Sequence, residues 1–358
     1  MKKSIFKLAL LLFIIPQIGF ANAGGDLKQE KSKTIKKEFK VNADATVDIE
    51  NKYGDVTVTT WDRNQVEITV IITVKGNSLS TIEKRLDGID VQFSGSASYV
   101  KAKTIIEKSG WSLWGSSNNV SYQINYTVKM PASNNVKLNN DYGSIVLDEL
   151  NGEANINCDY GKLIIGSLNN LRNEINIDYC SGSTINYMKN GSINADYSKL
   201  TVDKAYDLSV NADYSTLNFG KVNGIDFNGD YGSITVDEVN NMVANTDYVS
   251  VRIGTIRNNL KLDSDYGSIK IAELANGFNS ADINGQYTGI SIGIRSNNNF
   301  QFTVDLSYAG FSYDDDQVDM YKSIEKSTKK YFEGVYGKGS SKSKLRIKSQ
   351  YGNVKLKD

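Results

Sequence analysis

The sequence contains no histidine, only two prolines and only two cysteines among its 358 residues. Without imidazole the chain cannot form a Ser-His or Cys-His catalytic dyad or a His-ligated metal site. Two cysteines cannot build a disulfide framework. Cys158 and Cys180 also occupy different positions of the repeat described below, so we expect two thiols. The 30 glycines and 21 tyrosines beside so little proline indicate a folded, strand-rich chain.

A surplus of charge of either sign is also absent. The 41 basic and 41 acidic side chains cancel, and removing Lys2, Lys3 and Lys7 of the leader leaves 38 basic against 41 acidic. Proteins that bind nucleic acid in general carry a basic surplus, because they must neutralise phosphates. We therefore expect no nucleic-acid partner.

Residues 1–23 have the pattern of a secretory signal peptide. Three lysines precede an apolar run over Leu8–Ile15, and Ala21-Asn22-Ala23 provides an A-x-A cleavage site. The apolar run is shorter than the roughly 20 residues that span a bilayer. No cysteine follows it, which argues against a lipoprotein, and no later stretch is apolar enough to cross a membrane. We predict cleavage after Ala23 and an exported protein of the periplasm, outer surface or medium.

The dominant feature is an internal repeat marked by the dipeptide Asp-Tyr. Successive tyrosines of the eight copies lie 18, 19, 18, 17, 17, 17 and 18 residues apart, and degenerate copies surround Tyr53, Tyr287, Tyr308 and Tyr351. Such regular spacing is typical of repeat architectures. The eight aspartates are Asp141, Asp159, Asp178, Asp196, Asp213, Asp230, Asp247 and Asp265.

Each copy contains two alternating strands. The residue four before the tyrosine is apolar, the residue two before is mostly small or apolar, and the residue three before is nearly always asparagine. This period of two predicts a strand with one buried face, in phase with the tyrosine. A Gly or Ser turn, a second alternating strand and an Asn-rich turn complete the copy. We predict an all-β fold, a single-stranded parallel β-helix (β-solenoid) of about ten coils with 17–21-residue repeats, capped at both ends.

The flanks of the repeat suggest the domain organisation. After the signal peptide we expect a basic tether at 24–40, and then a first coil with capping strands and a short helix (Leu79–Leu86) at 41–131. The β-solenoid follows at 132–310. Residues 311–358 would hold an acidic insertion, a weakly helical Lys-rich run within Tyr313–Tyr331, and closing strands over Leu345–Leu356. Such covers protect solenoid ends from pairing with other chains.

The segment Asn51–Arg63 reads N-x-x-G-x-V-x-V-x-x-W-D-R and is followed by a strand ending at Met130-Pro131 and by G-x-I-x-V coils. This arrangement resembles the bacterial "putative adhesin" family, which is related to the head-GIN domains common in Bacteroidetes. The resemblance covers roughly residues 40–310. It implies an exported right-handed β-helix, and the family offers no catalytic residues to carry over.

The Asp column is the first candidate site. Stacked neighbours about 4.8 Å apart would repel each other by about 1 kcal/mol per pair even when hydrated. The favoured interpretation is that each carboxylate caps its own turn. The alternatives are a bridging hard cation, of which calcium is the best match, and a glycan-facing role. No cofactor is otherwise expected.

Three further features have two interpretations each. Stacked asparagines can form an amide ladder or a strip that binds sugar hydroxyls. The tyrosines are expected in the core or stacked at corners, with an exposed sugar-stacking platform as the alternative. Trp111 and Trp114, on a polar loop, either pack over the end of the stack or are displayed for a ligand.

The leading functional hypothesis is a non-enzymatic protein of the cell envelope or surface. It would act as an adhesin or scaffold that binds an envelope or extracellular component, with a glycan as one candidate. A polysaccharide-active enzyme is an alternative, because β-helices host enzymes built on acidic groups. However, the acidic residues recur uniformly, and none is singled out for catalysis. An envelope sensor or regulatory partner is the third hypothesis.

Overall fold

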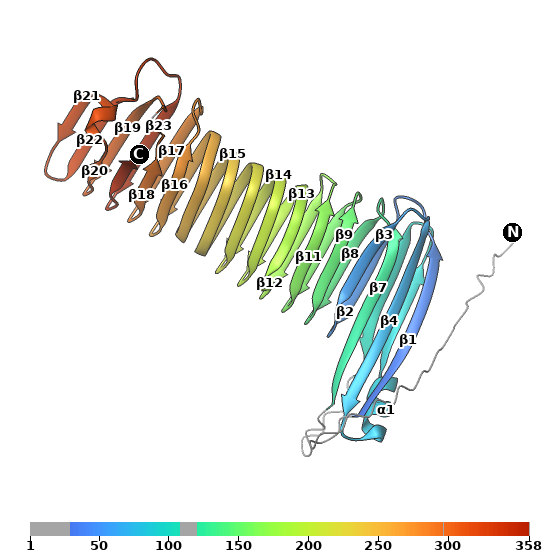
Figure 1. Ribbon diagram of the computed structural model, residues 1–358. Coiled ribbons are helices and arrows are strands. Elements are labelled where there is room, and N and C mark those ends of the chain that lie inside the picture. The colour runs from blue at the N-terminus through green and yellow to red at the C-terminus, as the bar shows by residue number, and fades with distance from the viewer. Residues whose placement is uncertain (1–28, 108–119, 296, 358) are drawn as a thin grey trace, which may run out of the picture. The chain divides into compact units, whose positions relative to one another are not determined.

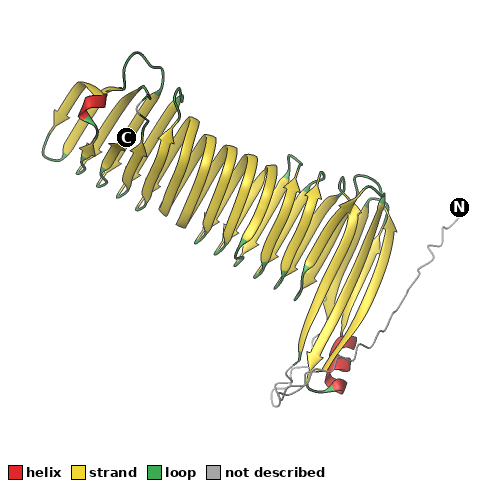
Figure 2. Cartoon of the chain, in the orientation of Figure 1, coloured by secondary structure: helices red, strands yellow, loops and turns green. Residues whose placement is uncertain are grey.

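The computed structural model describes residues 29–107, 120–295 and 297–357, and over these residues the protein is almost entirely strand (Figure 2). The predicted signal peptide lies outside the described residues. The chain divides into two compact units, Met1–Leu168 and Asn169–Asp358. This division falls inside the segment in which the sequence predicts repeats. The high strand content confirms the predicted all-β class.

Among its described residues the N-terminal unit contains one helix, α1 (Leu79–Asp87), which matches the predicted position. Its strands are β1 (Gln29–Lys40), β2 (Thr46–Lys52), β3 (Val56–Trp61), β4 (Gln65–Gly76), β5 (Ile89–Gly95), β6 (Tyr99–Ile106), β7 (Ser121–Pro131), β8 (Asn135–Asp141), β9 (Ser144–Leu150), β10 (Ala154–Asp159) and β11 (Lys162–Leu168).

Repeats of this unit pair in parallel and in register. Leu138 of β8 lies between Ile49 of β2 and Ile156 of β10. Along the second strand of each repeat, Ile145 of β9 lies between Val56 of β3 and Leu163 of β11. All six side chains are buried. Equivalent positions of the repeat therefore form continuous apolar columns, as the alternation predicts.

The predicted tether over 24–40 is wrong for residues 29–40, which form strand β1. This strand pairs antiparallel with β4 along its whole length, and β4 pairs antiparallel with β7 (Figure 1). The six lysines of 24–40 suggested a solvated segment, but alternate positions of β1 are partly buried. Lysine can lay its aliphatic stem over apolar surface while its ammonium group stays in water, so a Lys-rich segment can serve as an edge strand.

The C-terminal unit consists of strands and one short 3-10 helix, η1 (Asp315–Gln317). Its strands are β12 (Asn173–Asp178), β13 (Ser183–Asp196), β14 (Lys199–Asp213), β15 (Thr216–Asp265), β16 (Ser268–Leu274), β17 (Ser280–Gln286), β18 (Gly289–Gly293), β19 (Phe300–Ser307), β20 (Phe311–Ser312), β21 (Val318–Glu325), β22 (Lys329–Tyr336), β23 (Lys344–Gln350) and β24 (Val354–Lys357).

The same in-register parallel pairing continues here. Val210 of β14 lies beside Ile193 of β13 and Phe227 of β15, and all three are buried. Strand β15 alone is 50 residues long. It contains the Asp-Tyr corners at Tyr231 and Tyr248 and ends at Asp265, the first residue of the next corner. Repeats of 17–18 residues without room for a helix leave the chain extended from one corner to the next.

The last two strands lie between earlier ones. Strand β23 pairs in parallel with both β17 and β19, and β24 pairs in parallel with both β18 and β20. The predicted closing strands over Leu345–Leu356 therefore exist, but they lie between earlier strands of the C-terminal unit. The end of the chain thereby covers two sheet edges at once, which removes sites for pairing with other chains.

The predicted helical run within Tyr313–Tyr331 is wrong. Beyond η1 this segment belongs to β21 and β22, which pair antiparallel with each other, and β22 also pairs antiparallel with β19 (Figure 1). The lysines suggested a helix, yet Phe332 and Tyr336 are buried. Burial of these aromatic side chains against β19 overrides the weak helix propensity of the segment.

Both cysteines, Cys158 and Cys180, are buried thiols, as expected. Among the described residues no helix is long and apolar enough to cross a membrane.

Candidate functional site

The chain turns at a tyrosine in each repeat. Among the described residues, twelve residues other than glycine have positive φ, all of them are tyrosines, and their φ values lie between 48° and 65°. This left-handed region costs an L-residue about 1–2 kcal/mol, because Cβ approaches the carbonyl oxygen. The tyrosines are Tyr53, Tyr142, Tyr160, Tyr179, Tyr197, Tyr214, Tyr231, Tyr248, Tyr266, Tyr287, Tyr308 and Tyr351.

The rings form a stacked row, which we call the tyrosine ladder. In the C-terminal unit the row runs from Tyr179 through Tyr287 and Tyr351 to Tyr308, with centroids of successive rings 4.7–5.0 Å apart and planes within 10° of each other. In the N-terminal unit Tyr142 stacks between Tyr53 and Tyr160, with centroid distances of 5.2 and 5.0 Å. The spacing equals the separation of neighbouring strands.

Stacking at the corners is confirmed, but burial of the rings is wrong. Apart from Tyr53, which is less exposed, the ladder tyrosines are 44–59% exposed. The reason is the positive φ, which breaks the two-residue alternation at the corner and turns the ring out of the core. Because each interior ring covers the faces of its neighbours, the ladder presents ring edges and hydroxyl groups to solvent.

Backbone hydrogen bonds join successive corners of the repeat. The backbone N–H of Tyr197 donates to the carbonyl of Asp213 at 3.0 Å, and that of Tyr214 donates to Asp230 at 2.9 Å. The same contact joins Tyr142 to Asp159 and Tyr53 to Asp141 in the N-terminal unit. Every such bond links one corner to the next, so the ladder register is fixed by the backbone.

Buried hydroxyl groups cap the turns where serine or threonine follows the tyrosine. Ser215 Oγ donates to the carbonyls of Asp213 (2.9 Å) and Ala195 (2.8 Å) and accepts from the N–H of Ser198. Glycine follows the tyrosine in six other repeats, where a Cβ would meet the backbone of a neighbouring strand, and Cys180, Val249 and Ala309 follow it in the remaining three. A Cβ on Gly161 would lie 2.0 Å from the Gly143 carbonyl oxygen. Ser198 and Thr288 make the equivalent contacts, so a hydroxyl group caps the turn after Tyr197, Tyr214 and Tyr287, whereas capping by the Asp carboxylates stays a prediction.

The Asp column runs beside the tyrosine ladder and is exposed or half-exposed. Asp196 Oδ1 accepts from the N–H of Asp213 at 3.3 Å, and Asp213 Oδ1 accepts from the N–H of Asp230 at 3.1 Å. In the N-terminal unit Asp141 forms an ion pair with Lys52 at 3.2 Å. Where these contacts are seen, the carboxylate bonds to the adjacent repeat or to a lysine.

The pKa of several column carboxyls is raised. Partial burial is the main cause for Asp230, and the like charges of Asp213 and Asp247 add to it. Burial also raises the pKa of Asp178 and of Asp265, with contributions from neighbouring aspartates. The column thus opposes its own ionisation.

The Asn column forms the predicted amide ladder. Asn157 donates to Asn139 at 2.6 Å, Asn194 to Asn176 at 2.7 Å, and Asn211 to Asn194 at 3.1 Å. A second amide row was not predicted, although the Asn-rich turns hold its residues. In it Asn240 donates to Asn223, and Asn223 donates to Asp207, each at 2.9 Å. Stacked amides satisfy one another along the repeats.

Two predicted binding residues, Trp111 and Trp114, lie outside the described residues. Within the described ranges, no group of three acidic or cysteine side chains converges as metal ligands. Calcium binding along the Asp column stays a prediction.

Sequence reasoning missed a buried amide pair in the N-terminal unit. Asn51 Nδ2 donates to Asn140 Oδ1 and to the Ile124 carbonyl, each at 3.0 Å, and Asn140 Nδ2 donates to the Gly54 carbonyl at 2.9 Å. Both residues stand two before a ladder tyrosine, where other repeats have a small or apolar residue. An asparagine at a position that is otherwise small or apolar was the signal by which the sequence could have indicated this pair.

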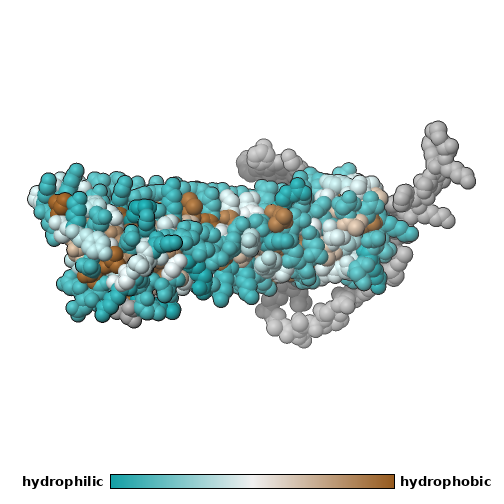
Figure 3. Space-filling view, turned by 90° about the horizontal axis from the view of Figure 1, so that it is seen from above, coloured by the Kyte–Doolittle hydropathy of each residue, from teal (hydrophilic) through white to brown (hydrophobic). Residues whose placement is uncertain are grey.

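The face of the molecule seen in Figure 3 gives little sign of an apolar contact area. Figure 3 shows one face of the molecule, on which hydrophobic residues form small separate groups among hydrophilic ones. Such scattered groups are normal on proteins and mark no interface.

No protein-family model and no curated protein matches the chain. Among solved structures, a "putative adhesin" from Parabacteroides merdae is 10% identical, with 90% of this chain and 95% of that chain covered and a TM-score of 0.37. A "putative adhesin" from Bacteroides fragilis is 13% identical, covering 90% and 97%, with a TM-score of 0.25. A "putative lipid binding protein" from Parabacteroides distasonis is 10% identical, covering 90% and 96%, with a TM-score of 0.27. With TM-scores this low, the likeness carries no argument about function.

Proposed function

We propose that the protein is an exported, non-enzymatic β-helix of the cell envelope or surface, which acts as an adhesin or scaffold and contacts an envelope or extracellular component through the tyrosine ladder. The observation that carries the proposal is the ladder itself, in which stacked rings are held half-exposed at left-handed corners. The β-helix is supported by the in-register parallel pairing of successive repeats and by the bend at each tyrosine.

The ladder costs more backbone strain than a corner requires. Glycine adopts positive φ at no steric cost, whereas tyrosine pays about 1–2 kcal/mol. Each stacked pair returns about 0.5–1.5 kcal/mol. Strain and stacking therefore nearly cancel, and stability alone does not explain why tyrosine occupies every corner. A contact role for the exposed edges explains this choice.

The chemistry of the ladder favours a polar polymer as the partner. Ring edges and phenol hydroxyls repeat along the units beside the Asp column, whereas the faces of interior rings are covered. Local desolvation, with neighbouring tyrosines and aspartates, raises the pKa of Tyr197 and Tyr248. These hydroxyls therefore stay protonated at neutral pH, so they donate as well as accept hydrogen bonds. A glycan that lies along the ladder fits this pattern better than one that must stack on ring faces.

A binding role also fits the uniformity of the acidic residues. Catalysis by paired carboxylates needs two groups whose environments differ. The Asp column repeats the same residue at the same position of each corner. We therefore propose no reaction. A panel of neutral and uronic-acid polysaccharides, examined for new reducing ends or unsaturated products, should remain uncleaved.

The test replaces three adjacent rungs, Tyr197, Tyr214 and Tyr231, by glycine, which tolerates the positive φ of the corners. Binding of the mature protein to immobilised mucin, peptidoglycan and collagen is compared with that of the triple variant. Loss of three hydrogen-bonding rungs, at about 1 kcal/mol each, should weaken binding on the order of 100-fold.

The matched control is Tyr206→Ala, because Tyr206 is 54% exposed but stands outside the ladder. It should bind like the wild type. Absence of wild-type binding to all three components, or equal binding by the triple variant, would refute the ladder as the contact surface.

A further inference from the structure

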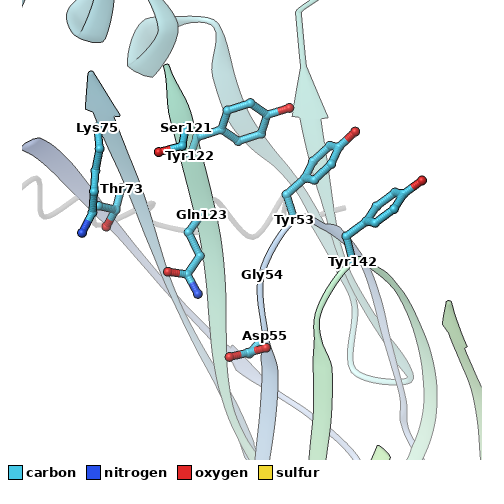
Figure 4. Close-up of a pocket in the computed structure, with 9 residues that line it drawn as sticks. All are labelled: Tyr53, Gly54, Asp55, Thr73, Lys75, Ser121, Tyr122, Gln123 and Tyr142. Carbon is cyan, nitrogen blue, oxygen red and sulfur yellow. The ribbon is translucent and has the colours of Figure 1, made fainter. Parts of the chain in front are cut away.

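A pocket of about 370 Å³ lies in the N-terminal unit, beside the ladder at Tyr53. We call it the Tyr53 pocket. Strand β4 contributes Thr73 and Lys75, and the start of β7 contributes Ser121, Tyr122 and Gln123. The remaining lining residues are Tyr53, Gly54, Asp55 and Tyr142 (Figure 4).

Three tyrosines provide an aromatic wall. The ring of Tyr122 meets that of Tyr53 edge-on, with centroids 5.2 Å apart and planes at 76°, and Tyr142 stacks on Tyr53. Figure 4 shows the three rings projecting to the same side. The Arg85 guanidinium lies 4.6 Å from the Tyr122 ring centroid. This cation–π contact restricts the rotation of the Tyr122 side chain and keeps its ring beside the pocket.

The polar lining carries both donors and acceptors. Asp55 is fixed from two sides, since its N–H donates to Asn125 Oδ1 at 2.9 Å and its Oδ1 accepts from the Ser144 N–H at 2.7 Å. The structure shows no bond from another described residue to Asp55 Oδ2 or to the Gln123 amide. A positioned carboxylate oxygen and an amide that both donates and accepts are therefore available to a ligand.

The charged groups at the pocket sum to one negative charge. Lys75 forms an ion pair with Glu30 at 2.8 Å, and Asp55 adds one negative charge. A phosphate or carboxylate ligand would face Asp55 without a free cation in the lining. A ligand with several hydroxyl groups, each able to donate to Asp55 and accept from Gln123, meets no such repulsion.

We propose that the Tyr53 pocket binds a residue of a neutral saccharide. The aromatic wall contacts the apolar side of the sugar, and Asp55 and Gln123 hydrogen-bond its hydroxyls. An aromatic concave site with a few convergent polar groups is the usual form of a small-ligand site. The site shares Tyr53 and Tyr142 with the ladder but contains none of the three rungs replaced in the triple variant, so its binding can be measured apart from theirs.

The experiment uses saturation-transfer NMR on the mature protein with cellobiose, chitobiose, maltose and mannobiose at millimolar concentration. At least one of these disaccharides should receive saturation from the protein. Gln123→Ala removes the amide, and Asp55→Asn removes the charge while keeping an acceptor for the Ser144 N–H. Each substitution should weaken binding about fivefold, as expected for the loss of one hydrogen bond.

The control Gln92→Ala makes the same change at an exposed position of β5 and should leave binding unaltered. The glycine triple variant of the ladder should also retain the saccharide signal, which separates this site from the proposed function. The proposal fails if no disaccharide is saturated. It also fails if Gln123→Ala and Asp55→Asn bind as the wild type does, or if glucuronic acid binds more tightly than the neutral sugars.

Discussion

At the scale of the residue, the corner tyrosine combines two opposing contributions. Tyr214 has φ of 53°, is 53% exposed, and stacks on Tyr197 and Tyr231 at 4.8 and 4.9 Å. The positive φ disfavours any residue with a Cβ, whereas the stacking favours an aromatic ring. A pair of substitutions can therefore separate the two contributions.

Tyr214→Ala should lower the free energy of unfolding by about 1–3 kcal/mol, because two stacked contacts are lost and the strain stays. A buried ring would instead cost about 3–5 kcal/mol. Tyr214→Gly should be about 1 kcal/mol more stable to unfolding than the alanine variant, since glycine releases the strain. Urea denaturation measures both. A glycine variant less stable than the alanine variant would contradict the account of the corner.

The Asp column gives a prediction about pH. Burial and then Asp213 and Asp247 raise the pKa of the Asp230 carboxyl above its unfolded value. A group with a raised folded pKa adds stability below the unfolded pKa and loses it as pH rises through the folded pKa. Asp230→Asn should therefore be at least as stable as the wild type at pH 7, and this advantage should vanish in the acid range.

Thermal unfolding between pH 3 and pH 7, at constant ionic strength, measures the difference for Asp230→Asn. Asp226→Asn is the matched control, because it removes the same charge from β15 outside the column. If both variants respond to pH alike, the effect belongs to net charge and not to the column.

Much of the corner could be predicted from the sequence, but its geometry could not. The spacing of Asp-Tyr gave the repeat, and the Asn positions gave the amide ladder. The alternation, continued as far as the tyrosine, wrongly placed the ring in the core. A reversal of φ at one residue leaves no trace in a two-residue period, and the residue after it varies among Gly, Ser, Thr, Cys, Val and Ala, so it does not mark the turn either.

At the scale of the element, strand β23 near the C-terminus lies between two earlier strands, β17 and β19, and pairs with both. Ile347 of β23 is 1% exposed and pairs with Ile283 of β17 and Val304 of β19. Tyr351 likewise completes the ladder between Tyr287 and Tyr308. The degenerate copy Gln350-Tyr351-Gly352 indicated one more repeat. The sequence did not show that this repeat lies between earlier ones, because order along the chain does not set order in the sheet.

Ile347→Ala should lower the free energy of unfolding by about 2–5 kcal/mol, because it loses burial and leaves a cavity between β17 and β19. In a repeat structure the effect should stay with nearest neighbours. Hydrogen exchange should therefore accelerate in β17, β19 and β23 and remain unchanged in β14.

The control is Arg346→Ala, which removes only the ion pair with Asp282 between partly exposed side chains. Such pairs contribute about 0–1 kcal/mol. Uniform acceleration of exchange throughout the C-terminal unit in Ile347→Ala would show that the unit unfolds as a whole and that the coil is not a local component.

At the scale of the whole molecule, the two compact units share one corner chemistry. Left-handed tyrosines, stacked rings and bonds between repeats occur in both. The units differ in their additional strands, which are the antiparallel β1, β4 and β5 in one and β21 and β22 in the other. The sequence located these flanking regions from the loss of the repeat. It mistook two of their segments, β1 and the run over β21 and the start of β22, because lysine-rich strands resemble tethers or helices in composition.

An adhesin requires the ladder to be reachable from outside the cell. The predicted leader should be removed after Ala23, so the mature chain should begin at Gly24, which N-terminal sequencing checks. Protease treatment of intact cells, followed by detection with an antibody to the mature chain, should then remove the signal. A periplasmic marker that survives in the same cells shows that they stayed intact, and lysed cells show that the protease cuts the chain. Protection until lysis would place the protein in the periplasm. Adhesion would then be excluded, whereas a scaffold that contacts envelope glycans through the same ladder would remain consistent with the corner chemistry.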